Sequence, residues 1–186
     1  SRIEEDKYVW MDRFTMRNLE LFYSPNEGAK TLIQVLDHTK SAMGARMLKR
    51  WLALPLKNKE QISERHNIVE QIFASEKLSN VLSKEISSIG DLDRLISKVA
   101  TMRLNPRECA RLKEALISLK PIKEICSSLD KDLKKIAFKI NPCANIIDMI
   151  EKALSDNPPM LIHKGNVIKS GINVELDELR SIQNSG

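Results

Sequence analysis

The chain has 186 residues, of which 42% are hydrophobic and 30% charged, with a formal net charge of +5. This length suffices for one domain with a real core, or one domain plus part of another, and no apolar run approaches the roughly 20 residues that a membrane span needs. With only 6 Gly, 7 Pro and 4% aromatic residues, the sequence favours a mainly α-helical fold over a turn-rich sandwich or barrel.

The N-terminal residues predict a short β element. Tyr8–Met11 and Arg17–Phe22 are the best strand candidates and would pair antiparallel. Ser24–Gly28 is typical of a turn. We therefore expect residues 1–24 to form an extended or β connector that leads into a helical domain over residues 25–159.

The middle of the chain predicts a series of helices. Leu32–Leu36 suits one short helix, and Ser41 is a plausible N-cap for the next, which ends at Pro55. Asn58 can cap a further helical stripe. Asp91 can cap another after the interruption at Gly90, which leaves Asp93 as a surface charge.

Two Asn-Pro pairs divide the second half into further helices. Asn105–Glu108 combines an N-cap, a proline at the first helical position and a Glu that can return a hydrogen bond, which is a strong start signal. Pro121 is expected to break the run. Residues 122–140 predict one or two amphipathic helices, and Asn141-Pro142 precedes another.

Residues 160–186 change character. Leu161-Ile162 and Val167-Ile168 predict a small β-hairpin or ribbon, and a last helix begins near Val174. The first residue is Ser1 rather than Met, and the last helical stripe stops before it can bury much. We therefore expect the chain to be a fragment of a longer polypeptide.

The residue types that carry chemistry are scattered. Glu27–Thr31 lacks the leading glycine and the Gly-Lys pair of a phosphate loop, so it does not predict nucleotide binding. The three cysteines and three histidines form no metal-binding pair, and free buried thiols fit a reducing cytosol. We predict no catalytic residue, no metal site and no cofactor for this chain.

Basic residues provide the candidate contact site. Four of them lie near one another in the sequence: Lys40, Arg46, Lys49 and Arg50. Arg46, Lys49 and Arg50 share part of one helix face. They could contact phosphate or the acidic surface of a neighbouring domain, or they could form a solvated face. The aromatic interleaving that marks a reader of single-stranded nucleic acid is absent from the sequence around them.

Several spaced motifs resemble, in order, the core (lever) domain of MutS-type DNA mismatch repair proteins. The first carry the patterns R-N-L-E-L, L-D-x-T and M-G-x-R followed by R-W-L, and the later ones lead toward that family's clamp domain. They are Arg17–Leu21, Leu36–Thr39, Met43–Arg46, Arg50–Leu52, Ile62–Arg65, Ile89–Leu95, Asn157–Met160, Gly165–Ile168 and Glu175–Arg180. His38 and Asp93 are mild departures from the pattern.

The resemblance implies a multi-helix lever bundle with small β elements near both ends, in which residues 160–186 lead toward a truncated clamp. It implies a parent protein of the bacterial cytoplasm that acts as a dimer on mismatched or looped DNA, bound to the nucleoid when on DNA, with a MutL-type partner. ATP and Mg would bind elsewhere in that parent, as would the mismatch. This chain would connect the ATPase domain to the clamp.

Four residues within the matched motifs are candidates for a structural or coupling role, namely Gly44, Trp51, Asp91 and Arg94. Two other function classes stay open on the sequence. The chain could bind duplex DNA directly through the basic surface, or it could be a helical scaffold for protein interaction. Salt-sensitive duplex binding would distinguish the first of these.

Overall fold

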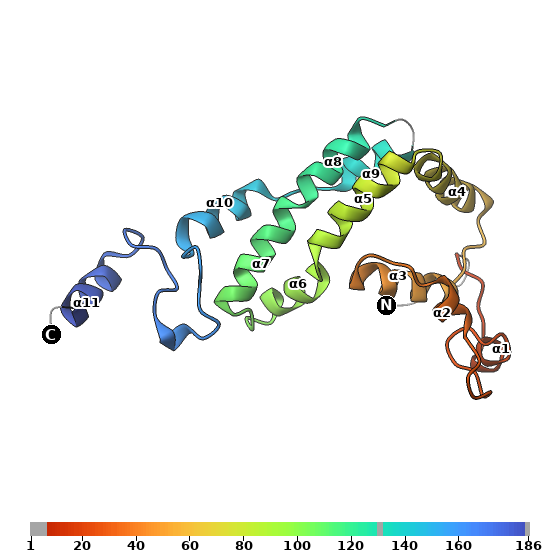
Figure 1. The fold of residues 1–186 in the computed structure, drawn as a ribbon, viewed down its shortest axis with the longest axis horizontal. Coiled ribbons are helices and arrows are strands. Elements are labelled where there is room, and N and C mark those ends of the chain that lie inside the picture. Colours follow the sequence, from red (N-terminus) through yellow and green to blue (C-terminus); the bar gives the residue numbers. More distant parts are fainter. Residues whose placement is uncertain (1–6, 130–131, 185–186) are drawn as a thin grey trace.

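The structure is a computed structural model that describes residues 7–129 and 132–184 of the chain. Residues 1–6 of the expected connector, and the link at 130–131, lie outside this part. The described residues form an elongated, mainly α-helical body, as predicted (Figure 1). Its helices are α1 (Arg13–Asn18), α2 (Leu32–Leu36), α3 (Ala42–Ala53), α4 (Lys59–Phe73), α5 (Glu76–Ile89), α6 (Leu92–Ala100), α7 (Pro106–Ile117), α8 (Leu119–Ser127), α9 (Asp132–Lys139), α10 (Ala144–Ala153), the 3₁₀ helix η1 (Ile162–Lys164) and α11 (Val174–Asn184).

The central bundle consists of α5, α7, α8 and α9, with α4 packed on α5 and α9 and with α6 and α10 packed on α7. Figure 1 shows α1 and α2 at one end of the body and α11 at the other. The core is thin, because an elongated body has a large surface for its volume. Its buried members are Leu82, Ile89, Ala115, Ile122, Cys126, Leu133 and Ala137.

Local capping signals start several helices at the expected residues. The Asn58 side chain accepts a hydrogen bond from the Gln61 N–H at 2.9 Å, which caps α4. Asn105 and Glu108 form the reciprocal capping box of α7. The break expected at Pro121 occurs earlier, at Ser118, since a proline is tolerated in the first turn of α8.

Glu108 links this cap to α6, because the Lys98 ammonium donates a hydrogen bond to its carboxylate. That bond, and then the backbone N–H of Asn105, hold the pKa of Glu108 below its ordinary value. A pKa lowered by folding means that the charge contributes its full stability above the unfolded pKa, and that this contribution is lost as the pH falls through the lower folded pKa.

Glu108→Gln is therefore expected to lose less stability than the unchanged chain when the pH is lowered from neutral to about 3. The Gln amide can still accept from Asn105, but it cannot titrate. Thermal unfolding followed by circular dichroism over this pH range measures the difference. Equal acid sensitivity of the two chains would contradict the assignment.

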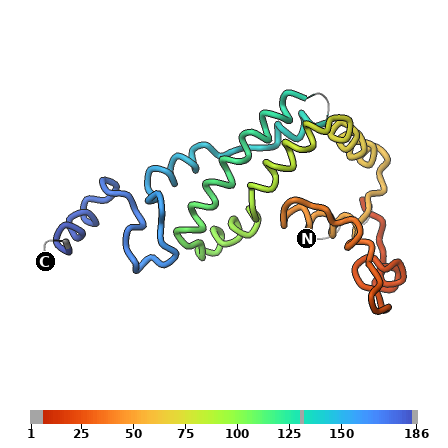
Figure 2. Tube along the Cα trace, viewed as in Figure 1, coloured from red at the N-terminus to blue at the C-terminus, as the bar shows by residue number. Residues whose placement is uncertain are grey.

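The strand predicted at Arg17–Phe22 is wrong. Residues 13–18 form α1, whose N-cap Asp12 accepts a hydrogen bond from the Thr15 N–H at 2.6 Å. Tyr8 forms an isolated antiparallel bridge with Leu56 instead. Figure 2 shows this first segment running beside the link between α3 and α4. The β character near this end thus depends on a partner far along the chain.

The hairpin predicted around Leu161 and Val167 is also wrong. The intervening residues form η1 at Ile162–Lys164, and Ile168 pairs with Leu154 in an isolated antiparallel bridge. The Ser155 N–H donates to the Val167 carbonyl at 2.9 Å, and the Lys169 N–H donates to the Ala153 carbonyl at 2.9 Å. The segment after η1 is therefore attached to the end of α10.

Candidate functional site

Helix α3 carries most of the candidate residues, and its start depends on local contacts. The Ser41 hydroxyl accepts a hydrogen bond from the Gly44 N–H at 3.1 Å, as expected of an N-cap. A Cβ at Gly44 would lie 3.2 Å from the Ser41 Oγ and 3.4 Å from the Thr39 Cβ. The glycine therefore lets the preceding loop fold closely over the first turn of its own helix.

Arg46 of α3 joins two acidic residues at the start of α6, and we call these three residues the Arg46 fork. Its Nη1 and Nη2 donate to the two carboxylate oxygens of Asp91 at 2.9 and 2.7 Å, and Nη2 also donates to Asp93 at 3.0 Å. Asp91 simultaneously caps α6 by accepting from the Arg94 N–H at 3.3 Å. The sequence motifs at Met43–Arg46 and Ile89–Leu95 thus meet in space.

The fork shifts the pKa of two of its members, Asp91 and Arg46. The Arg46 guanidinium holds the pKa of Asp91 below its usual range, and the hydrogen bonds to Asp91 and Asp93 raise the pKa of Arg46. The Arg46 side chain is 51% exposed, so solvent screens the attraction. Its main effect is geometric, because a two-point hydrogen bond sets the orientation of α3 against α6.

A second contact joins α3 to α4. The Arg65 guanidinium stacks on the Trp51 ring, with Cζ 3.6 Å from the ring centroid. Trp51 is 42% exposed, so this cation–π pair lies at the surface. Lys49 lies over the Phe22 ring at 5.6 Å, which places it toward the segment that precedes α2.

The structure brings some of the predicted residues together and separates others. Arg46, Arg50 and Trp51 line one hollow of about 370 Å³, which we call the arginine hollow, and Arg65 lies in its wall. Lys40 and Lys49 do not line it. Arg94 lies in a neighbouring hollow of about 550 Å³ with acidic and basic side chains in equal number.

Sequence reasoning missed Arg65, and it predicted only a surface charge at Asp93. Arg65 belongs to the family-like motif Ile62–Arg65, and this membership could have marked it as a candidate site residue. Asp93 follows the cap residue by two positions, and its pairing with Arg46 depends on how α3 lies against α6. The segment around Asp91 therefore has two roles, a cap and an ion-pair acceptor.

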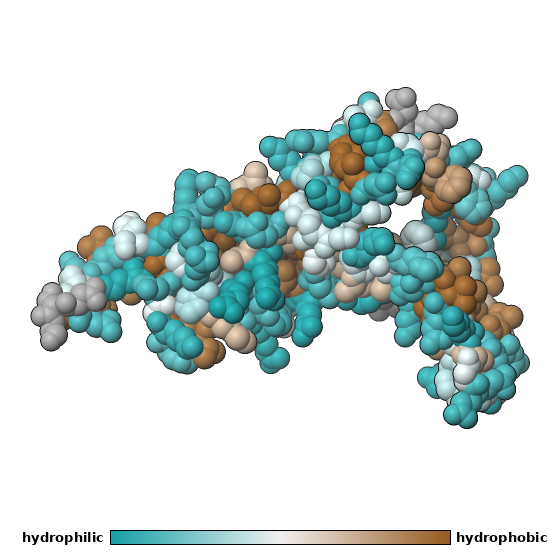
Figure 3. Space-filling view, in the orientation of Figure 1, coloured by the Kyte–Doolittle hydropathy of each residue, from teal (hydrophilic) through white to brown (hydrophobic). Residues whose placement is uncertain are grey.

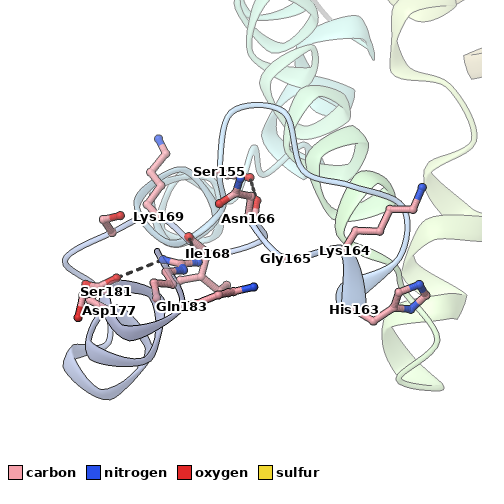
Figure 4. A pocket seen from close by; sticks show the side chains of 12 residues that line it. Ser155, His163, Lys164, Gly165, Asn166, Ile168, Lys169, Asp177, Ser181 and Gln183 are labelled. Atoms are coloured by element: carbon pink, nitrogen blue, oxygen red, sulfur yellow. Dashed lines mark hydrogen bonds and ion pairs between the residues drawn. The ribbon is translucent and has the colours of Figure 1, made fainter. Parts of the chain in front are cut away.

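A larger hollow of about 910 Å³ lies near the C-terminal end (Figure 4). His163 and Lys164 lie on one side of the view, away from Asp177 and Ser181 of α11. The guanidinium of Arg180, also on α11, already forms hydrogen bonds within the chain, since it donates to Asp177 at 3.1 Å and to the Ile168 carbonyl at 2.8 Å. These side chains do not converge on one point, as a catalytic group would have to.

Three other properties of the described part of the chain bear on its function: metal binding, cysteine reactivity and the capacity of its helices to span a membrane. Among residues 7–129 and 132–184, no group of three His, Cys, Asp or Glu side chains is placed to hold a metal ion. Burial raises the pKa of Cys109 and Cys126, which keeps these thiols protonated and weakly reactive. In the same residues, no helix has the length and apolar character to cross a membrane.

A family model described as MutS domain III matches residues 14–184. Over its whole length the chain is 50% identical to a DNA mismatch repair protein MutS of Bacteroides fragilis, 49% to that of Bacteroides thetaiotaomicron and 48% to that of Cytophaga hutchinsonii. It spans 22% of the length of each of these relatives. The motif order, the helical fold and these similarities agree, and the chain belongs to the MutS domain III family.

Proposed function

We propose that this chain is the core, or lever, of a MutS-like DNA mismatch repair protein, in which it transmits ATP-driven movement between an ATPase domain and a DNA-gripping clamp. The Arg46 fork is the observation that carries the proposal. It ties α3 at one end of the body to α6, which packs on α7 of the central bundle. A displacement of α3 would therefore reach the bundle as a rigid-body shift.

The parent protein supplies the rest of the activity in this proposal. It binds mismatched or looped duplex DNA, uses ATP and Mg in its ATPase domain, works as a homodimer in the bacterial cytoplasm and meets a MutL-type partner. The relatives are DNA mismatch repair proteins named MutS, which supports the repair role. The chain's own contribution is mechanical, so neither mismatch reading nor ATP hydrolysis is assigned to its residues.

The large exposed apolar side chains fit a domain that other domains cover. At the N-terminal end they include Trp10 at 71% and Phe14 at 73% exposure, and on α11 they include Leu179 and Ile182. Figure 3 shows apolar surface on the face in view over the N-terminal end of the body. Exposed apolar surface on this scale marks interaction sites.

The test uses the full-length protein that contains this domain. Arg46→Ala is expected to slow ATP-dependent release from a mismatched duplex by about fivefold, the lower end of usual coupling strengths, while mismatch affinity without nucleotide stays unchanged. Arg46→Lys keeps the charge but loses the two-point bond, so its rate of DNA release should lie between the rates of the unchanged protein and Arg46→Ala. Stopped-flow fluorescence of labelled DNA measures the release.

Arg103→Ala is the matched control, because Arg103 is an exposed arginine in the link between α6 and α7. It should release DNA at the unchanged rate. A folded Arg46→Ala protein with unchanged release would overturn the coupling role of the fork. Tight duplex binding by the 186-residue chain itself, which weakens as the salt concentration is raised, would favour the direct DNA-binding alternative instead.

A further inference from the structure

The arginine hollow contains cationic groups that the Arg46 fork does not use. It lies between α3, α4, the segment at Tyr8 and the start of α6. Arg46 is already held by two carboxylates there. Within the described part of the chain, however, no side chain or carbonyl accepts a hydrogen bond from Arg50 or Arg65. Two guanidinium groups therefore face one small concavity without an anionic partner.

Arg65 is held in a fixed position for binding an anion. Stacking on Trp51 at 3.6 Å uses the face of the guanidinium and leaves the N–H groups at its edge free to donate. A guanidinium that is already positioned loses less entropy when it binds a carboxylate. Arg50 lies on α3 one position before Trp51 and lines the same hollow, so it can supply the second donor group.

The frame around these charges is apolar. Met47 is 55% exposed and Trp51 is 42% exposed, and both line the hollow together with Leu54 and Tyr8. A ligand that fits must combine one negative group with apolar neighbours. Such a ligand resembles a protein segment with an acidic side chain between aliphatic ones, since arginine and aromatic side chains are typical anchors of protein interfaces.

A nucleic-acid backbone fits this hollow less well. A duplex presents a row of phosphates and binds to several cations spread along its path. Here only two arginines without an anionic partner in the described residues, Arg50 and Arg65, line a single concavity of about 370 Å³. Asp93 lies in the same wall and is paired with Arg46, so Arg46 does not supply a further cation for a second phosphate.

We propose that the arginine hollow binds a protein segment that presents one carboxylate between apolar side chains. Arg50 and Arg65 bind the carboxylate, and Met47 and Trp51 contact the apolar neighbours. The partner segment would lie across α3 and α4 and would cover the exposed part of Trp51. This surface does not depend on the coupling role proposed above, because it needs no movement of α3.

The experiment uses the ¹⁵N-labelled 186-residue chain and the probe acetyl-Leu-Glu-Leu-amide, compared with acetyl-Leu-Gln-Leu-amide. Titration should shift the indole N–H signal of Trp51 and the side-chain N–H signals of Arg50 and Arg65. Replacing the carboxylate by an amide should weaken binding by about tenfold, the factor for 1.4 kcal/mol, because the hydrogen bonds lose their charge assistance. The titration can also measure weak binding, since chemical shifts change with the fraction of the chain that is bound.

Variants locate the site. Arg50→Ala and Arg65→Ala should each reduce binding of the Glu probe, while Arg103→Ala should leave it unchanged. Arg65→Lys keeps the charge but loses the stacked, flat donor edge, so it should bind more weakly than the unchanged chain. Unperturbed backbone spectra of Arg50→Ala, which changes an exposed side chain, establish that the fold is intact.

Three results would overturn the proposal. The first is equal binding of the Glu and Gln probes, which would leave no role for a carboxylate. The second is full binding by the folded Arg50→Ala and Arg65→Ala chains, which would place the site elsewhere. The third is a short DNA duplex that shifts the same signals at lower concentration than the Glu probe, which would identify a phosphate backbone as the ligand.

Discussion

Leu133→Ala is expected to lower the free energy of unfolding of this chain by about 3 kcal/mol. Leu133 is 3% exposed and belongs to the buried cluster with Ile122 and Cys126 of α8. Helices α8 and α9 form the most extensive helix contact in the body. Removing the isobutyl group leaves a cavity that neighbouring helices fill only in part, which adds to the lost burial.

The control lies on the same helix. Phe138 is 79% exposed, so Phe138→Ala should change the free energy of unfolding little although it removes a larger side chain. Urea unfolding at neutral pH, followed by both circular dichroism and tryptophan fluorescence, measures the two variants. Similar losses for Leu133→Ala and Phe138→Ala would show that α9 does not pack on α8 as described.

Asp91→Ala is expected to destabilise the chain by about 1 kcal/mol, and Asp91→Asn by much less. Asp91 has two roles, since it caps α6 through the Arg94 N–H and accepts the two-point bond from Arg46. Alanine removes both contacts. Asparagine keeps an oxygen for the cap but cannot form the charged pair, so the two variants separate the cap from the ion pair.

Hydrogen exchange gives the second measurement for these variants. Both should raise the exchange rate of amides in α3, because the tie from Arg46 is weakened in each. The α6 amides should exchange faster only in Asp91→Ala, where the cap is lost. If Asp91→Asn left α3 exchange unchanged, the fork would not hold α3 against the body, and the coupling proposal would lose its carrying observation.

Helix starts could be predicted from the sequence because capping is local. Ser41, Asn58, Asp91 and Asn105 each cap a helix through an N–H three residues ahead. Such contacts need no knowledge of the rest of the fold. Apolar spacing was less reliable in detail, since Ile136, an apolar residue of the segment predicted to be amphipathic at 122–140, is 38% exposed.

The β elements were mispredicted because a strand depends on its partner. Apolar residues at Arg17–Phe22 and around Leu161 suit a strand locally, yet within residues 7–129 and 132–184 no strand is placed to pair with them. The bridges that do form join Tyr8 to Leu56 and Leu154 to Ile168. Partner choice at such distances is decided by how the helices pack, and pattern alone does not encode it.

The sequence by itself determined the helical class, the starts of several helices and, through its ordered motifs, membership of the MutS domain III family. Only the tertiary structure showed that Arg46 is bound to Asp91 and Asp93, and that Arg50 and Arg65 line one hollow without an anionic partner among the described residues. The physical reason is the distance along the sequence between the residues that interact. Caps and helical stripes arise from neighbours three or four residues apart, whereas the pairing of charges on α3, α4 and α6 is decided by how separate helices pack.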